Sequence, residues 1–166
     1  MKRVAVYGST GSIGVQTLNV VRRFPHEYKV VALSAGNNTR LLEKQISEFL
    51  PEYASAGRDF DACGATAFTG KDAALRVASE ADADIAVMAI SGMDALAPLL
   101  ECIRRGERIA LANKEAIVCA GDIVLGAAEA SGAEIVPVDS EHSAVFQCLS
   151  CGDRRDVRRI ILTASG

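Results

Sequence analysis

The sequence predicts an α/β protein with a Rossmann-like, doubly wound and mainly parallel sheet. Short apolar runs typical of buried strands alternate with amphipathic stretches typical of helices along most of the 166 residues. The first apolar run leads directly into a glycine-rich turn, and a helical pattern follows it. A strand, a glycine-rich turn and a helix in this order are typical of a dinucleotide-binding unit.

The elements follow from the same patterns in chain order. Strands are expected at Arg3–Tyr7, Lys29–Ser34, Tyr53–Ala56, Ala65–Phe68, Ile85–Ala89, Arg108–Leu111, Glu134–Val138 and Val157–Thr163. Helices are expected at Ser12–Arg23, Thr39–Phe49, Lys71–Ser79, Met93–Arg105 and Lys114–Ser131, with a further helical pattern at Ala144–Leu149. Thr39 is expected to cap the second helix, and Gly106 and Gly132 stand where helices should end.

Composition and charge exclude several classes of protein. The chain is 49% hydrophobic and 23% charged, which is typical of a globular domain. The net charge of −3 includes no long basic run, so nucleic acid is not expected as a partner. No apolar run approaches the roughly 20 residues that a membrane-spanning helix needs, so no membrane association is expected.

The cysteines are expected to be reduced thiols. They are Cys63, Cys102, Cys119, Cys148 and Cys151. Only Cys148 and Cys151 have a spacing typical of metal or redox pairs, and no second pair or histidine completes a zinc site. Reduced thiols indicate a cytosolic compartment.

The glycine-rich turn reads Gly8-Ser9-Thr10-Gly11-Ser12-Ile13-Gly14. We expect Gly8 to permit the sharp turn, Gly11 to let the backbone approach a pyrophosphate, and Gly14 to allow close packing of helix on strand. The amides from Thr10 to Ile13 would then face an anion at the positive end of a helix dipole. A purely structural turn is the alternative reading.

The segment after the second strand, Ser34–Arg40, indicates which cofactor is bound. An NAD site usually has an acidic residue here that holds the ribose 2′-hydroxyl group, and this segment has none. Gly36, Asn37 and Asn38 offer a close backbone and amide donors, and Arg40 could reach a 2′-phosphate. The absence of the acid favours NADP, although Asn37 and Asn38 could also simply form a turn.

Two further polar clusters follow strands. Lys114 and Glu115 open a helix, where Lys114 could meet a developing negative charge or could simply be solvated.

Asp139 and Glu141 would project on one face if the strand continues, as hard oxygen ligands for Mg²⁺ or Mn²⁺. They could equally cap a helix. His142 is not expected to be a ligand.

The motifs GSTGSIG, LANKE, PVDSEHSA and LTASG, in this order, resemble those of the 1-deoxy-D-xylulose 5-phosphate reductoisomerase family. The resemblance implies an NADPH- and metal-dependent rearrangement and reduction of 1-deoxy-D-xylulose 5-phosphate to 2-C-methyl-D-erythritol 4-phosphate, in non-mevalonate isoprenoid biosynthesis. The metal would be Mg²⁺, Mn²⁺ or Co²⁺, and the substrate a phosphorylated sugar.

The resemblance also implies a role for individual residues. The cofactor would be bound by Thr10, Gly11, Ser12, Ile13, Gly36, Asn37, Asn38, Asn113 and Glu115. The metal would be held by Asp139 and Glu141, and the substrate would contact Lys114, Ser140, Glu141 and Ser165. Lys114, Asp139 and Glu141 would be the catalytic residues. Some family members have Lys where this chain has Asn37.

The family pattern continues beyond LTASG, so we expect the chain to be part of a longer protein. Residues 1–132 would form the NADPH-binding domain, and residues 133–166 would begin an α+β catalytic domain. The 166 residues alone would then be inactive. The resemblance further implies a homodimer of the full-length protein, in the bacterial cytoplasm or, less expected, the plastid stroma.

Two other classes remain open at this point. Homoserine and semialdehyde dehydrogenases have similar glycine-rich turns, but they do not explain Asp139-Ser140-Glu141 followed by LTASG. A non-catalytic nucleotide-sensing Rossmann module would use the acidic cluster only as a helix cap.

Overall fold

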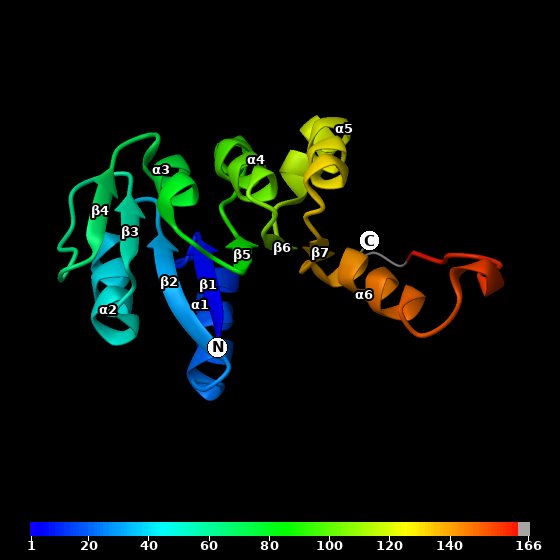
Figure 1. The fold of residues 1–166 in the computed structure, drawn as a ribbon, viewed down its shortest axis with the longest axis horizontal. Helices are drawn as coiled ribbons and strands as arrows, with labels where there is room; N and C mark the ends of the chain where they lie inside the picture. Colours follow the sequence, from blue (N-terminus) through cyan, green and yellow to red (C-terminus); the bar gives the residue numbers. More distant parts are fainter. Residues whose placement is uncertain (163–166) are drawn as a thin grey trace.

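The computed structural model describes residues 1–162, which form a seven-stranded parallel sheet in the order β4-β3-β2-β1-β5-β6-β7 (Figure 1). The strands are β1 (Lys2–Tyr7), β2 (Tyr28–Ser34), β3 (Tyr53–Ala56), β4 (Thr66–Thr69), β5 (Ile85–Met88), β6 (Arg108–Leu111) and β7 (Ile135–Pro137). The helices are α1 (Ser12–Arg23), α2 (Thr39–Phe49), α3 (Ala73–Glu80), α4 (Leu96–Arg104), α5 (Lys114–Ser131) and α6 (Ser140–Leu149), with short 3₁₀ helices η1 (Met93–Ala95) and η2 (Arg154–Asp156).

The chain winds in two directions from the centre of the sheet. It runs from β1 through α1, β2 and α2 to β3, and later from β5 through α4, β6 and α5 to β7. Helices α1 and α2 pack on one face, while α3, α4 and α5 pack on the other (Figure 1). Opposite winding places helices on both faces because each crossover has the same hand. The predicted doubly wound α/β fold is therefore confirmed.

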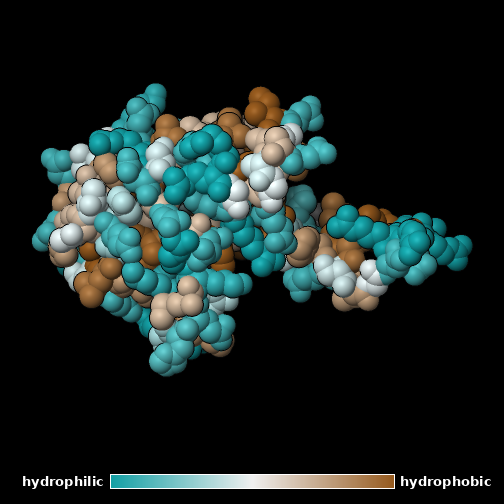
Figure 2. All heavy atoms as spheres, in the orientation of Figure 1, coloured by the Kyte–Doolittle hydropathy of each residue, from teal (hydrophilic) through white to brown (hydrophobic). Residues whose placement is uncertain are grey.

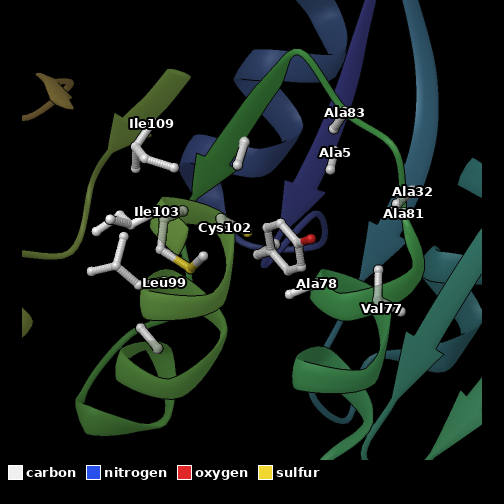
Figure 3. Packing of buried hydrophobic residues seen from close by; sticks show 14 of the residues in the cluster. Ala5, Ala32, Val77, Ala78, Ala81, Ala83, Leu99, Cys102, Ile103 and Ile109 are labelled. Carbon is white, nitrogen blue, oxygen red and sulfur yellow. The ribbon is translucent and has the colours of Figure 1, made fainter. Parts of the chain in front are cut away.

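Alternation along the strands divides the core into two layers. In β1, Val4 and Val6 belong to the layer under α1 and α2, whereas Ala5 and Tyr7 belong to the layer under α3 to α5. Figure 3 shows the second layer, in which strand residues such as Ala5 and Ile109 belong to one cluster with Leu99, Cys102 and Ile103 of α4.

Up to β7 the predicted elements agree with the structure within one or two residues, except that the predicted helix Met93–Arg105 is divided into η1 and α4, which begins at Leu96. Helix α6 begins at Ser140, earlier than the predicted Ala144. The predicted strand Val157–Thr163 is wrong over residues 157–162, which are exposed and have no strand structure; Thr163 lies outside the described residues. A strand needs neighbouring backbone for its N–H and C=O groups, and α6 carries the chain away from the sheet edge at β7 (Figure 1).

Specific residues end and begin the helices. Asn38, not the predicted Thr39, caps α2, since its side chain accepts a hydrogen bond from the Leu41 amide at 3.3 Å. Gly132 ends α5 at φ 76° and Gly106 follows α4 at φ 74°, as predicted. Helix α5 is interrupted at Ala120, whose φ is −141°. Within residues 1–162 no helix combines the length and apolarity needed to cross a membrane.

A buried ion pair holds the turn between α4 and β6. The side chain of Glu107 is only 4% exposed, and its Oε1 lies 3.4 Å from Nε of Arg105. Arg105 also donates hydrogen bonds to the carbonyls of Ser79 and Ala81 at the end of α3. Burial raises the pKa of Glu107 to about 7, although Cys102 and Arg105 oppose the shift. Arg105 therefore joins the end of α3 to the turn. The buried Glu107 carboxyl group costs free energy to ionise.

We predict that Glu107→Gln makes the free energy of unfolding less dependent on pH. In the unfolded chain the pKa of this carboxyl returns to about 4.3, so its contribution to stability is fully present below that pH. The contribution is lost as pH rises through 7, and roughly 3 kcal/mol is lost by pH 8. Urea unfolding at pH 5 and 8 measures the change. Glu129→Gln, exposed on α5, is the control, and an equal effect of Glu107→Gln at both pH values would contradict the prediction.

Candidate functional site

The predicted site residues that the structure describes all lie at one edge of the sheet. Parallel strands place their carboxyl ends together, and neighbouring ends are in register, with Tyr7 beside Ser34 and Met88, and Leu111 beside Pro137. The turns after β1, β2, β5, β6 and β7 therefore meet at this edge, where α/β proteins bind ligands. Ser165 lies outside the described residues.

Two glycines of the first turn are required by the fold. Gly8 has φ +85°, and a Cβ atom there would lie 2.4 Å from the carbonyl oxygen of Ala89. A Cβ atom at Gly14 would lie 2.3 Å from the carbonyl oxygen of Gly8. Both contacts are far below van der Waals distance, so any side chain must force the backbone apart. The predicted roles of Gly8 in the turn and Gly14 in helix packing are confirmed.

Two other glycines at the same edge are not required by the fold. Gly11 caps α1 with φ −80°, and a Cβ atom there would approach the Gly8 oxygen only to 3.4 Å. A Cβ atom added at Gly36 would meet no other heavy atom within 4 Å. Both residues are exposed. A glycine that neither backbone angle nor packing demands is well suited to the close approach of a ligand to the main chain.

Hydrogen bonds to β2 and α2 fix the position of the glycine-rich turn. The amides of Gly8 and Ser9 both donate to the Ser34 carbonyl at 2.8 Å. From α2, Gln45 Nε2 donates to the Ser9 carbonyl at 2.9 Å. The first amides of α1 have no acceptor within the helix, and its first turn carries no acidic residue. The turn therefore presents N–H groups and the positive end of α1 at a fixed position.

Asn113 connects the turns that follow β5 and β6. Its Oδ1 accepts from the Ala116 amide at 2.7 Å and so caps α5, while Nδ2 donates to the carbonyls of Ile90 at 2.8 Å and Gly92 at 2.9 Å. The residue is 2% exposed. This side chain thus has a structural role, whereas Lys114, next along α5, is exposed.

The turn Ala89–Gly92 is part of the site and was not predicted from the sequence. It lies against Gly8 and is fixed by Asn113, at the point where the two directions of winding meet between β1 and β5. The Ser91-Gly92 pair directly after a buried strand is the signal that could have identified it.

The acidic cluster after β7 is a helix start rather than a strand. Strand β7 ends at Pro137, so the predicted projection of Asp139 and Glu141 from one strand face is wrong. Asp139 caps α6, and its Oδ1 accepts from the amide of His142 at 3.0 Å and lies 2.6 Å from Nδ1 of the same residue. Ser140 Oγ donates to Glu141 Oε2 at 2.8 Å. The cap still holds both carboxylates at the site edge.

Both carboxylates of this cluster favour the charged form. The Ser140 hydroxyl, and more weakly the charge of Lys114, lower the pKa of Glu141. Desolvation raises the pKa of Asp139, but the hydrogen bonds from His142 outweigh it and leave the pKa below its ordinary value. Lys114 after β6 is thus electrostatically coupled to Glu141 after β7.

The cluster opens onto a hollow of about 880 Å³ between α6 and residues 156–162. Ser140 and Glu141 line it together with apolar side chains such as Val145 and Ile161. Figure 2 shows this part of the chain projecting from the main body of the molecule. Residues 1–162 contain no group of three acidic, histidine or cysteine side chains placed to hold a metal ion. Asp139 and Glu141 could therefore supply only part of a metal's ligands.

Comparison with known proteins gives one consistent family. The family model of 1-deoxy-D-xylulose 5-phosphate reductoisomerase matches residues 4–121, and the model of that enzyme's C-terminal domain matches residues 135–166. The 1-deoxy-D-xylulose 5-phosphate reductoisomerase of Geotalea uraniireducens is 45% identical over the whole chain, which covers 45% of that relative. The chain thus spans about half the length of the curated relatives it matches.

Solved structures agree with this family. A crystal structure of DOX-P reductoisomerase in complex with NADPH, fosmidomycin and magnesium superposes with a TM-score of 0.84 at 35% identity, over 90% of this chain and 39% of that one. A homoserine dehydrogenase from Thiobacillus denitrificans gives a TM-score of 0.53 at 22% identity, over 82% of this chain and 28% of that one. The second likeness shows the shared fold alone.

We predict that alanine substitutions separate the glycines of the first turn into two groups. Gly8→Ala and Gly14→Ala should each lower the free energy of unfolding by roughly 3 kcal/mol or more, because each forces a backbone clash. Gly11→Ala should cost about 1 kcal/mol or less, as the loss of a mildly favoured cap residue. Urea unfolding measures all three. Gly126→Ala, in α5 with open space around it, is the control, and equal losses at Gly8 and Gly11 would contradict the prediction.

Proposed function

The chain belongs to the 1-deoxy-D-xylulose 5-phosphate reductoisomerase family, and we propose that the whole protein performs the reaction for which that family is named. It would rearrange and reduce 1-deoxy-D-xylulose 5-phosphate to 2-C-methyl-D-erythritol 4-phosphate with NADPH and a divalent metal, in non-mevalonate isoprenoid biosynthesis. The structural observation that carries the proposal is the pair of exposed glycines, Gly11 and Gly36, that the fold itself does not require.

NADPH would lie along the turns after β1, β2 and β6. The amides of Thr10, Ser12 and Ile13 would bind the pyrophosphate at the start of α1, whereas the Gly11 amide donates to the Gly8 carbonyl at 3.0 Å. Gly36, Asn37 and Asn38 would contact the adenosine ribose, in a turn that lacks the acid of an NAD site. Asn113 and Glu115 would lie toward the nicotinamide, Asn113 through its backbone, since its side chain is engaged within the protein.

Substrate and metal would lie beyond the ends of β6 and β7. Asp139 and Glu141 are charged hard oxygen ligands, which suits Mg²⁺, Mn²⁺ or Co²⁺. When bound, NADPH would supply the hydride and the cation would polarise the substrate's oxygens. Lys114 would add a positive charge near the same oxygens, Ser140 would hydrogen-bond the substrate, and Ser165 would belong to the region that binds the substrate phosphate.

The reductoisomerase reading is favoured over a homoserine or semialdehyde dehydrogenase. The family models cover residues on both sides of the acidic cluster, whereas the homoserine dehydrogenase likeness concerns the fold alone. We propose the division into an NADPH-binding part, residues 1–132, and the start of a catalytic part, residues 133–166. The homodimer and the bacterial cytoplasm stay predictions.

We predict that Asp139→Asn and Glu141→Gln abolish metal-dependent turnover of the whole protein. Asparagine caps a helix as well as aspartate does, so Asp139→Asn keeps the start of α6 and removes only the charge. Losing one charged metal ligand removes several kcal/mol of transition-state stabilisation, which is roughly a hundredfold or more in rate. NADPH oxidation with 1-deoxy-D-xylulose 5-phosphate and Mn²⁺ measures the effect.

Asp122→Asn, which neutralises an exposed carboxylate on α5, is the matched control and should keep full turnover. Unchanged turnover and Mn²⁺ affinity in both site variants would defeat the metal assignment. Absence of turnover in the unmodified whole protein would defeat the proposed reaction itself.

A further inference from the structure

We propose that Arg58 binds the 2′-phosphate of NADPH and thereby sets a preference for NADPH over NADH. The inference rests on the proposed function, in which the cofactor's adenosine ribose lies beside Gly36, Asn37 and Asn38. The positive charge of that subsite would then come from the turn after β3, not from the ribose turn itself.

The backbone register brings Arg58 to the ribose turn. Strands β2 and β3 are paired at Ser34 and Ser55, and the pairing continues past both strand ends. The amide of Ala35 donates to the Ser55 carbonyl at 2.9 Å, and the amide of Gly57 donates to the Gly36 carbonyl at 2.9 Å. The next residue, Arg58, donates from Nη2 to the Asn37 carbonyl at 2.6 Å. Its guanidinium is therefore anchored on the outer side of this turn.

The guanidinium remains available to a ligand. Arg58 is exposed, and the ion pairs within residues 1–162 do not include it. The hydrogen bond to Asn37 uses one of its several N–H donors, which form a planar fork that matches a phosphate group. A side chain held by one donor, with the others free, binds an anion with less loss of conformational entropy than an unanchored one.

The surroundings of the turn favour an anion. No acidic residue occurs from Ser34 to Arg40, and the positive end of α2 begins at the Asn38 cap. Glu43, one turn further along α2, accepts a hydrogen bond from the Asp61 amide at 3.0 Å. Asp59 follows Arg58 in the chain but forms no ion pair with it within the described residues. A 2′-phosphate would therefore meet Arg58 and the start of α2 together.

Arg40 is the alternative cation, and the sequence pointed to it first. It lines a separate hollow of about 540 Å³ on α2, together with Glu43, Glu48, Asp61 and Cys63. Three carboxylates and one further cation, Lys44, line this hollow, so it favours a phosphate less than the ribose turn, which has no acidic residue. Arg58 contacts the ribose turn directly, so the structure favours Arg58.

Calorimetric titration of NADPH and of NADH into the whole protein tests the assignment, because only NADPH carries the 2′-phosphate. Arg58→Ala should weaken NADPH binding roughly tenfold to a hundredfold and leave NADH binding within about twofold. Arg58→Lys keeps a charge without the fork, so it should give an intermediate loss. Arg23→Ala removes an exposed charge at the end of α1 and should change neither affinity.

The outcomes separate this assignment from the proposed function. Equal weakening of NADPH and NADH by Arg58→Ala would show a merely structural role and overturn the assignment, while NADPH binding by the unmodified whole protein still stands. No effect on either cofactor, or loss of the preference in Arg40→Ala instead, would overturn it too. If the unmodified whole protein binds no NADPH, both the assignment and the proposed cofactor site are refuted.

Discussion

The contact between Gly8 and the carbonyl of Ala89 is the constraint on which the rest of the site depends. It brings the end of β1 against the turn after β5, at the centre of the sheet where the two directions of winding meet. Gly14 then lies on Gly8, which fixes the start of α1 above the same point. With β1, β5 and α1 held together, the amides of the glycine-rich turn are fixed in position, so little reorganisation is needed on binding.

Hydrogen bonds between turns extend this arrangement along the sheet edge. Asn113 ties the turn after β5 to the start of α5, and Gln45 ties the glycine-rich turn to α2. Asp139, through its cap of α6, holds the acidic cluster beside the end of β6. The first two contacts join different elements and the third fixes the start of α6, so these turns are preorganised along the edge.

Much of the fold and part of the site could be predicted from the sequence, because local patterns determine them. Buried strands and amphipathic helices have distinct periodicities, so α1, α2 and α5 were predicted with correct ends. The glycine-rich turn could also be predicted from the local sequence, because Gly8 and Gly14 are closely spaced in the chain. The prediction of a strand at residues 157–162 was wrong because apolar content alone does not supply a neighbour to pair with.

The features that escaped prediction depend on contacts between distant segments. Nothing near Arg58 in the sequence links it to Asn37, which it reaches only through the pairing of β2 with β3. The turn Ala89–Gly92 gains its importance from Gly8, far away in the chain. The choice between strand and cap at Asp139 required knowing that β7 ends at Pro137, since both patterns fit the same residues.

The proposed NADPH site lies along the carboxyl edge of the sheet, over the two glycines that the fold does not require, Gly11 and Gly36. Amide chemical shifts of the ¹⁵N-labelled chain, recorded during a titration with NADPH, test it most directly. The largest changes are expected at Gly11, at Gly36 and in the turn Ala89–Gly92, with little change in β4. Changes concentrated in the hollow between α6 and residues 156–162, or no change at saturating NADPH, would contradict it.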